Sequence, residues 1–158
     1  MGERARILVV DDDESIRKVL AMILEEIGHV VDTAENGKEA IAKSNVKFYN
    51  LALIDIRLPD MEGVALLTKM KDRTPKMRKI IITGYPSQQN AIEALNKGAD
   101  AYIMKPFDME IVLGTVKEQL RKQEEEKKYS QERVEEFIET RVKELEEEEK
   151  PFVGKRRH

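Results

Sequence analysis

The sequence predicts an α/β fold: a sheet of five parallel strands with helices on both faces, followed by a helical extension. Two observations support this prediction. Short runs of consecutive apolar residues recur along the chain, as in strands buried on both faces, and segments with helical apolar periodicity separate them. Strands that alternate with helices form parallel sheets, and right-handed crossovers leave few topologies. We assign residues 1–121 to this domain and residues 122–158 to a charged helical linker or extension.

The first strand is the apolar run at residues 7–10, and acidic residues follow it directly. Apolar side chains within residues 16–27 recur at steps of three and one, which marks one face of a helix. Gly28 ends this helix, because glycine readily adopts the left-handed conformation that follows a helix terminus. Residues 29–31 begin the second strand, and a turn at Asn36 leads into a short second helix.

The third strand is another fully apolar run, residues 51–54, and it ends on Asp55. The segment after it contains Pro59 and Gly63, which are typical of a loop. Residues 64–70 then form the third helix. The uninterrupted apolar run predicts a central strand with helices on both sides.

The fourth strand covers residues 80–82 and ends on Thr83. A loop and an apolar-lined helix follow, and Gly98 closes that helix. Residues 101–104 form the fifth strand. Asp108 caps the last helix, because its side chain can accept hydrogen bonds from the first free backbone N–H groups.

Composition excludes several classes of protein. The chain has 158 residues, no cysteine and two isolated histidines, so disulfides, thiolate metal sites and histidine metal clusters are excluded, and a cytoplasmic location fits. No segment approaches the roughly eighteen apolar residues of a membrane span, and the N-terminus does not resemble a secretory signal. Residues 1–120 carry 17 basic and 19 acidic residues, so we expect neither direct nucleic-acid binding nor membrane binding.

Polar residues follow four of the five predicted strands: Asp11 and Asp12 the first, Asp55 the third, Thr83 the fourth and Lys105 the fifth. In an open α/β sheet, ligands bind outside the carboxyl ends of the strands, where the strand order reverses. If the first and third strands are neighbours there, three carboxylates meet, and they stay charged together only with a cation. An all-oxygen acidic site suits a hard cation such as Mg²⁺. The hydroxyl and the ammonium would complete a pocket for a phosphoryl-type anion.

Four motifs stand at these strand ends in order: VVDD, LIDIRLPDMEG, IIITGY and YIMKPF. Together they resemble the response-regulator (CheY-like) receiver domain of two-component signal transduction, over residues 5–120. The resemblance implies a flavodoxin-like sheet with strand order 2-1-3-4-5. It also implies a cytoplasmic phosphoprotein of a phosphorelay rather than an ordinary enzyme, although receivers carry out phosphorylation and dephosphorylation chemistry on themselves.

The same resemblance implies that Asp55 is the nucleophile that accepts a phosphoryl group from a sensor histidine kinase, a phosphotransfer protein or a small phosphodonor. Asp12 and Asp55 would ligate Mg²⁺, with Asp11 helping directly or through water. The backbone carbonyl of Arg57 would supply a further oxygen. Lys105 would pair with the transferring phosphoryl group, whose charge Mg²⁺ spreads.

Thr83 and Tyr102 resemble the switch residues of the family. Thr83 would hydrogen-bond the phosphate, Tyr102 would swing inward behind it, and the bond between Lys105 and its proline would be cis. Thr83, Lys105 and Tyr102 each also have a purely structural interpretation. Thr83 could cap the segment that follows it, Lys105 could be a surface lysine, and Tyr102 could be a core residue. Asp13 is most simply the cap of the first helix.

Arg57 and Tyr85 are candidates for tuning the lifetime of the phosphorylated state. They lie two residues after Asp55 and Thr83, where receivers flank the path of the water that hydrolyses the aspartyl phosphate. Both side chains are large. We expect them to screen that water, so that the phosphorylated state persists for minutes or longer.

The tail combines a polar stretch with one amphipathic helical stripe. Residues 121–133 are almost entirely polar, and beyond them Val134, Ile138, Val142 and Leu145 recur at steps of four, four and three. Such a stripe packs on the receiver, on a second copy in a homodimer, or on another protein, unless it is simply a solvated helix. The chain is either a stand-alone receiver or the N-terminal part of a larger regulator.

Three functions are compatible with these residues. The leading one is a phosphoacceptor signalling module, in which phosphorylation of Asp55 changes partner binding at the face of the fourth helix, fifth strand and fifth helix. The alternative is a Mg²⁺-dependent phosphohydrolase of the haloacid-dehalogenase type with Asp11 as nucleophile, but the later acidic pair it needs is missing. A degenerate receiver acting as a scaffold disagrees with the intact set of acids, threonine and lysine.

Overall fold

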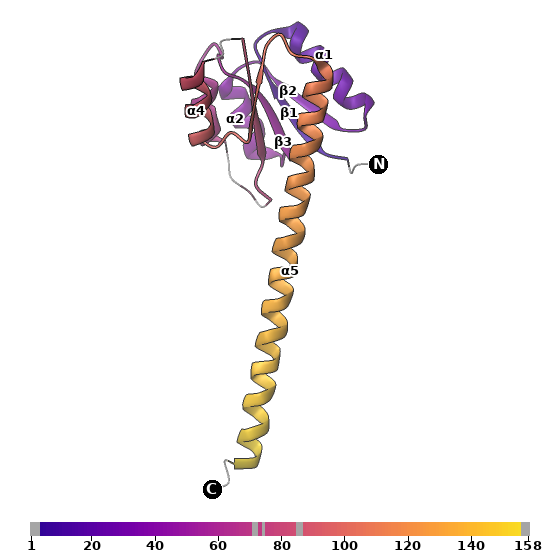
Figure 1. Cartoon of the computed structure of the whole chain (residues 1–158), viewed down its shortest axis with the longest axis vertical. Coiled ribbons are helices and arrows are strands. Elements are labelled where there is room, and N and C mark those ends of the chain that lie inside the picture. Colours follow the sequence, from indigo (N-terminus) through magenta and orange to yellow (C-terminus); the bar gives the residue numbers. More distant parts are fainter. Residues whose placement is uncertain (1–3, 71–72, 74, 85–86, 156–158) are drawn as a thin grey trace. The chain divides into compact units, whose positions relative to one another are not determined.

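The computed structural model describes residues 4–70, 73, 75–84 and 87–155, which belong to two compact units. The first unit ends at Gln123 and contains a parallel sheet with helices on both faces (Figure 1). The second begins at Glu124 and is helical as far as the description extends. Within the described ranges, no helix has the length and apolar character that crossing a membrane requires.

The sheet has the predicted strands and the predicted order, β2-β1-β3-β4-β5, with every neighbouring pair parallel. The strands are β1 (Arg6–Val10), β2 (Val30–Ala34), β3 (Leu51–Asp55), β4 (Arg78–Thr83) and β5 (Ala101–Met104). In β1, Val10 pairs with Ala34 on one side and with Ile54 on the other. The residues that follow β1 and the end of β3 therefore share one edge of the sheet.

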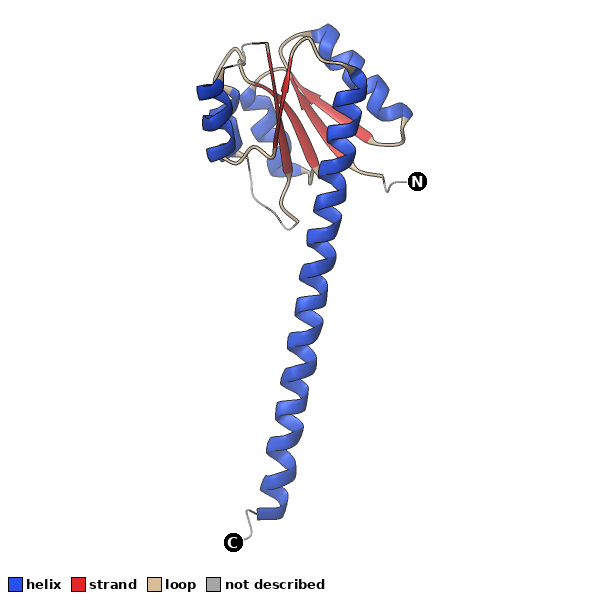
Figure 2. Ribbon diagram, viewed as in Figure 1, coloured by secondary structure: helices blue, strands red, loops and turns tan. Residues whose placement is uncertain are grey.

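Five helices connect and follow the strands: α1 (Glu14–Glu26), α2 (Gly37–Val46), α3 (Gly63–Lys69), α4 (Gln88–Asn96) and α5 (Met109–Lys155). Helix α1 and the first turns of α5 cover one face of the sheet, with Leu20, Leu24, Val112 and Val116 buried beneath them. Helices α2, α3 and α4 cover the other face and form the second half of the core (Figure 2). This two-sided cover explains why the central strands are apolar on both faces.

The helix ends confirm the local signals in the sequence. The Asp13 side chain accepts hydrogen bonds from two backbone N–H groups in the first turn of α1, and Asp108 accepts one from Glu110 at the start of α5. Gly28 and Gly98 follow α1 and α4 with φ angles of 104° and 106°. Only glycine adopts that conformation without strain, so these two residues end their helices.

Strand β4 begins earlier than the apolar pattern predicts, at Arg78 rather than Ile80. The next residue, Lys79, lies on the strand with 4% of its surface exposed. Its Nζ donates a hydrogen bond to the carbonyl oxygen of Leu67 in α3, at 2.7 Å. The buried ammonium therefore has a partner on a helix, and a search for apolar runs misses strand residues of this kind.

Gln123 is buried, although it lies in the polar stretch that predicts a solvated linker. It has 4% of its surface exposed. Its Nε2 donates hydrogen bonds of 2.8 Å to the carbonyl oxygens of Asn50 and Lys76, and its Oε1 accepts one of 3.2 Å from Asn50 Nδ2. These contacts satisfy a buried amide, so this turn of α5 is attached to the end of the sheet opposite the acidic residues.

Candidate functional site

The loop after β1 holds the buried side chain of Asp11 at the carboxyl edge of the sheet. The backbone N–H of Asp11 donates to the carbonyl oxygen of Ala34 at the end of β2, at 3.1 Å. Its carboxylate accepts from the N–H of Asp13 at 2.9 Å, and its carbonyl oxygen accepts from Nη1 of Arg17 at 2.7 Å. The loop is therefore fixed by both neighbouring elements, β2 and α1.

Asp55 is the last residue of β3, with 7% of its surface exposed. Its Oδ1 lies 3.4 Å from the backbone N–H of Arg57, which donates to it. Helix α3 begins very close by: the N–H of Gly63 donates to the carbonyl oxygen of Ile56 at 2.6 Å. A Cβ added to Gly63 would lie 2.2 Å from the carbonyl oxygen of Asp55, so a glycine is needed here.

The carboxylates from the two loops meet, as predicted. Oxygens of Asp11, Asp12 and Asp55 lie within 4.8 Å of one another, with Asp12 exposed and the other two buried. Nζ of Lys105 lies 3.0 Å from Oδ2 of Asp11 and 3.6 Å from Oδ2 of Asp55. The ammonium thus lies beside two of the three clustered carboxylates, and the remaining negative charge favours a cation.

The charges of the site shift the pKa values of two of its residues. Burial raises the pKa of Asp55, the neighbouring charge of Asp11 raises it further, and Lys105 offsets part of the increase. Burial alone would lower the pKa of Lys105, but the hydrogen bond and the charge of Asp11 outweigh it, so that pKa lies above its usual value. The ammonium therefore stays charged, and a nearby cation would favour the ionised form of Asp55.

The donor set fits Mg²⁺. The acidic cluster offers one oxygen from each of three carboxylates, and Mg²⁺ prefers a few carboxylate oxygens with water in its remaining positions. The exposed side of the cluster at Asp12 leaves room for those waters. Asp11, Asp12 and Asp55 would hold the ion, and the carbonyl of Arg57 as a further ligand stays a prediction.

Thr83 lies beside Lys105 at the same edge. It ends β4, is completely buried, and its carbonyl oxygen accepts a hydrogen bond of 2.6 Å from the backbone N–H of Lys105. The peptide bond between Lys105 and Pro106 is cis, which confirms that expectation. The structure thus brings Thr83 and Lys105 to the acidic cluster, and their roles toward a phosphoryl group stay predictions.

Tyr102 lies on β5, where it pairs with Ile81, and its ring packs against the core beneath α2, α3 and α4. Its hydroxyl is buried and has no hydrogen-bond partner within the described part of the chain. The core packing and the switch role are both compatible with this position, so the switch role stays a prediction. Of the two residues expected to tune the lifetime, Arg57 is exposed at the site, and Tyr85 lies outside the described residues.

Three residues that the sequence analysis does not assign to the site support its backbone. Arg17 and Gly63 contact the backbone of Asp11 and Asp55 respectively. Asp60, in the loop after β3, accepts two hydrogen bonds from the start of α2. A glycine at the beginning of a helix, as at position 63, is a sequence signal for a close approach of two backbones. The contacts of Asp60 join residues far apart along the chain, so no local pattern indicates them.

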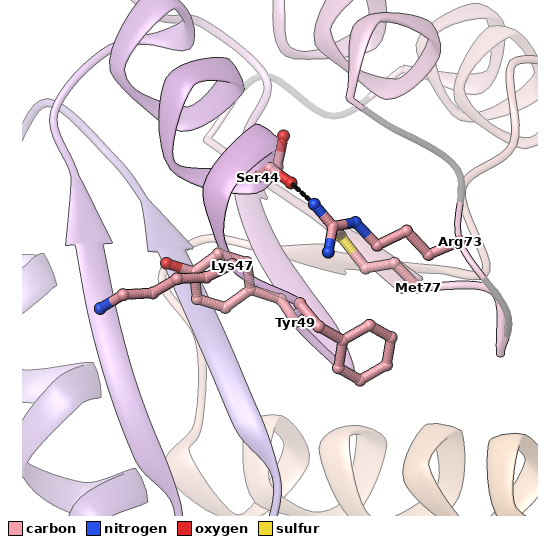
Figure 3. Close-up of a pocket in the computed structure, with 6 residues that line it drawn as sticks. Ser44, Lys47, Tyr49, Arg73 and Met77 are labelled. Carbon is pink, nitrogen blue, oxygen red and sulfur yellow. Dashed lines mark hydrogen bonds between the residues drawn. The ribbon is translucent and has the colours of Figure 1, made fainter.

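A separate hollow lies beside α2, away from the acidic cluster. It has no room for a water-sized molecule and is lined by Ser44, Lys47, Phe48, Tyr49, Arg73 and Met77 (Figure 3). The Arg73 guanidinium donates to the carbonyl oxygen of Ser44 at 3.2 Å. The hollow contains none of the predicted site residues, so the acidic cluster remains the candidate site.

Comparisons with known proteins identify the family to which the chain belongs. A family model described as response regulator receiver domain matches residues 7–117. The transcriptional regulatory protein ZraR of Klebsiella oxytoca is 40% identical over 119 residues, which are 75% of this chain and 27% of that protein. The matched part of this chain spans 24% of the length of NtrC of Salmonella typhimurium and 52% of the length of PhoP of Escherichia coli.

Solved structures similar to this chain are also response regulators. The crystal structure of a response regulator receiver domain protein (CheY-like) from Methanospirillum hungatei JF-1 has a TM-score of 0.74 and 48% sequence identity, covering 78% of this chain and 99% of that one. A response regulator protein from Burkholderia pseudomallei, solved with a phosphorylated aspartic acid, calcium ion and citrate, has a TM-score of 0.68 and 30% identity. That match covers 78% of this chain and 72% of the other.

Proposed function

Because the chain belongs to the response-regulator receiver family, we propose that it accepts a phosphoryl group on Asp55 in a Mg²⁺-dependent reaction and thereby changes its partner binding. The observation that supports this most directly is the meeting of Asp11, Asp12 and Asp55 within 4.8 Å, with Lys105 beside them. That arrangement supplies a nucleophile, a cation site and a fixed positive charge in one place.

The chemistry is a transfer from a phosphodonor to a carboxylate. An oxygen of Asp55 attacks the phosphorus, while the bond from phosphorus to the donor breaks and its electron pair leaves with the donor. Mg²⁺, when bound, supplies positive charge that lowers the cost of bringing two anions together. Lys105, 3.6 Å from Oδ2 of Asp55, neutralises part of the charge on the transferred group.

The donor is a sensor histidine kinase or a phosphotransfer protein, as in the family. The output face is the surface of α4, β5 and α5, where four large apolar side chains are exposed: Ile92, Leu95, Met104 and Ile111. Exposed apolar groups of this kind favour a protein partner. The expectation that the chain does not itself bind nucleic acid stays a prediction, since ZraR is a transcriptional regulatory protein and this chain matches only part of it.

The C-terminal helix offers a second contact surface. In the unit that begins at Glu124, Val134, Ile138, Val142 and Leu145 are each about half exposed. An exposed apolar stripe on a helix is stabilised when it packs on another apolar surface, such as the same stripe of a second copy. We assign it to a homodimer contact.

Phosphorylation of Asp55 is tested by incubating the chain with Mg²⁺ and acetyl phosphate and measuring its intact mass. Wild type should gain one phosphoryl group, and Asp55→Asn should gain none, because an amide is a poor nucleophile. Asp108→Asn is the matched control, since asparagine also caps a helix and Asp108 lies outside the acidic cluster.

Three outcomes would contradict the proposal. One is a gain of phosphoryl by Asp55→Asn equal to that of wild type. Another is steady turnover of a phosphate ester that Asp11→Asn abolishes and Asp55→Asn does not, which would favour the phosphohydrolase. The third is a chain that gains nothing under any condition, which would be a scaffold instead.

A further inference from the structure

The loop that carries Arg57 is attached at its tip to the start of α2. Asp60 in this loop accepts two hydrogen bonds through its two carboxylate oxygens. Oδ1 accepts from the N–H of Gly37 at 2.8 Å, and Oδ2 accepts from the N–H of Lys38 at 2.9 Å. Both oxygens of one exposed carboxylate are thus used to hold the loop to a helix that lies more than twenty residues earlier in the chain.

Close packing accompanies this attachment. The Met61 side chain lies over Gly37, and a Cβ added to Gly37 would lie 2.4 Å from its sulfur. Gly37 is itself buried, whereas Asp60 and Pro59 at the loop tip are exposed. Glycine at position 37 therefore allows the loop to approach the helix start closely enough for the two hydrogen bonds.

The loop between these attachment points is short and internally bonded. Arg57 and Glu62 form an isolated antiparallel bridge, and the N–H of Leu58 donates to the carbonyl oxygen of Met61 at 3.1 Å. A segment closed in this way moves largely as one body. A displacement of its tip at Asp60 therefore moves the backbone of Arg57, next to Asp55.

We propose that Asp60 is a positioning residue for the metal site: by holding the loop to α2, it keeps the main chain at Arg57 in place to ligate Mg²⁺. This inference rests on the proposed function, because it assumes that the acidic cluster binds Mg²⁺. Asp60 does not belong to the cluster of Asp11, Asp12 and Asp55 and acts through the loop backbone. Groups that orient metal ligands in this way affect metal affinity strongly.

The rival explanation is that Asp60 merely caps α2, and the chain contains a matched control for it. The side chain of Asn36 accepts from the N–H of Glu39 at 2.8 Å, so it caps the same helix end and, among the described residues, makes no hydrogen bond to the loop. Asn36→Ala and Asp60→Ala each remove a cap from α2, but only Asp60→Ala releases the loop. Both variants should therefore lower the melting temperature, and only Asp60→Ala should also disturb the loop at Arg57.

The test is a Mg²⁺ titration of wild type, Asp60→Ala, Asp60→Asn and Asn36→Ala by calorimetry. We expect Asp60→Ala to weaken Mg²⁺ binding about tenfold or more. Asn36→Ala should bind as wild type does. Asp60→Asn should fall between wild type and Asp60→Ala, since its amide keeps one acceptor oxygen. In ¹H–¹⁵N spectra recorded without metal, the Arg57 amide signal should shift in Asp60→Ala and not in Asn36→Ala.

The Mg²⁺ affinities of the variants decide between a positioning role of Asp60 and a simple helix cap. Equal Mg²⁺ affinity in wild type and Asp60→Ala would overturn the proposal, as would equal weakening by Asn36→Ala. If wild type itself bound no Mg²⁺, the proposed function would be wrong. The Arg57 signal in the metal-free protein would then still decide whether Asp60 positions the loop.

Discussion

The ammonium of Lys105 lies closer to Asp11 than to Asp55, with Nζ 3.0 Å from Oδ2 of Asp11 and 3.6 Å from Oδ2 of Asp55. It also makes its hydrogen bond with Asp11. The positive charge of the site is thus directed mainly at one carboxylate, and the buried Asp55 has a raised pKa. Lys105 therefore compensates only part of the negative charge at Asp55, and a divalent ion would compensate the rest.

Asp55→Asn should therefore stabilise the metal-free protein at neutral pH. The pKa of Asp55 is higher in the folded chain than its unfolded value of 3.8, so the ionised form is disfavoured in the folded state. The free energy of unfolding should then fall as pH rises through the folded pKa. Asp55→Asn does not lose stability in this way, because asparagine does not titrate. The difference in the free energy of unfolding between the variant and wild type should therefore shrink as the pH is lowered toward about 4.

Thermal unfolding in the presence of a chelator, followed by circular dichroism at several pH values, measures this effect. Asp108→Asn is the control and should differ little from wild type at any pH. A variant Asp55→Asn that is less stable than wild type at neutral pH would contradict the assigned electrostatics.

Gly63→Ala should be strongly destabilising, by about 3 kcal/mol or more, because the added Cβ would lie 2.2 Å from the carbonyl oxygen of Asp55. Gly114→Ala is the matched control: it lies within α5, and an added Cβ there meets nothing within 4 Å. In a helix interior, alanine is favoured over glycine by about 0.5–1 kcal/mol, so this variant should be stabilised. Urea unfolding measures the free energy of unfolding of both variants. Equal changes in Gly63→Ala and Gly114→Ala would show that the close contact at Gly63 is unimportant.

Stability should also depend on pH through His29. Its Nδ1 accepts a hydrogen bond of 3.1 Å from the N–H of Ala5, and burial lowers its pKa below 6.5. The unfolded chain then binds a proton at a higher pH than the folded chain does. The free energy of unfolding should thus fall as pH decreases from 6.5 to the folded pKa.

His29→Asn keeps an acceptor for Ala5 but does not titrate in this range. The comparison is denaturant unfolding of wild type and His29→Asn between about pH 7 and pH 5. Wild type should lose stability over this range relative to the variant. Parallel curves would mean that His29 does not titrate differently on folding.

If the C-terminal helix forms a homodimer, the apparent mass of the chain should increase with concentration. Ile138→Glu should abolish this increase, because a charge would be buried between the apolar stripes. Val46→Glu makes the same change at an exposed position of α2 and should leave association unaffected. Sedimentation equilibrium over a range of concentrations measures both. If wild type is monomeric throughout, the stripe has a different partner.

The lifetime prediction concerns Arg57 and Tyr85. If these large side chains screen the hydrolytic water, Arg57→Asn combined with Tyr85→Ala should speed the loss of phosphoryl from Asp55. The rate is followed by intact mass after removal of acetyl phosphate. An unchanged rate would remove both residues from consideration.

The local pattern of the sequence was sufficient to predict the strands and the polar residues that follow them. Apolar runs mark central strands because both faces of the sheet are covered, and the residue after such a run must lie at its carboxyl edge. With the first and third strands as neighbours, Asp11 and Asp55 could be placed together, although α1, β2 and α2 separate them along the chain. The strand order itself came from resemblance to a known family.

The sequence by itself determined which residues stand at the carboxyl edge, since periodicity and helix caps act over a few neighbouring residues. The tertiary structure alone decided which distant groups hold that edge in place. The contact of Asp60 with Gly37 joins residues 23 apart, and that of Gln123 with Asn50 joins residues 73 apart. Such hydrogen bonds depend on where the packed elements place two backbones, and a polar residue carries no local mark of a partner that far away.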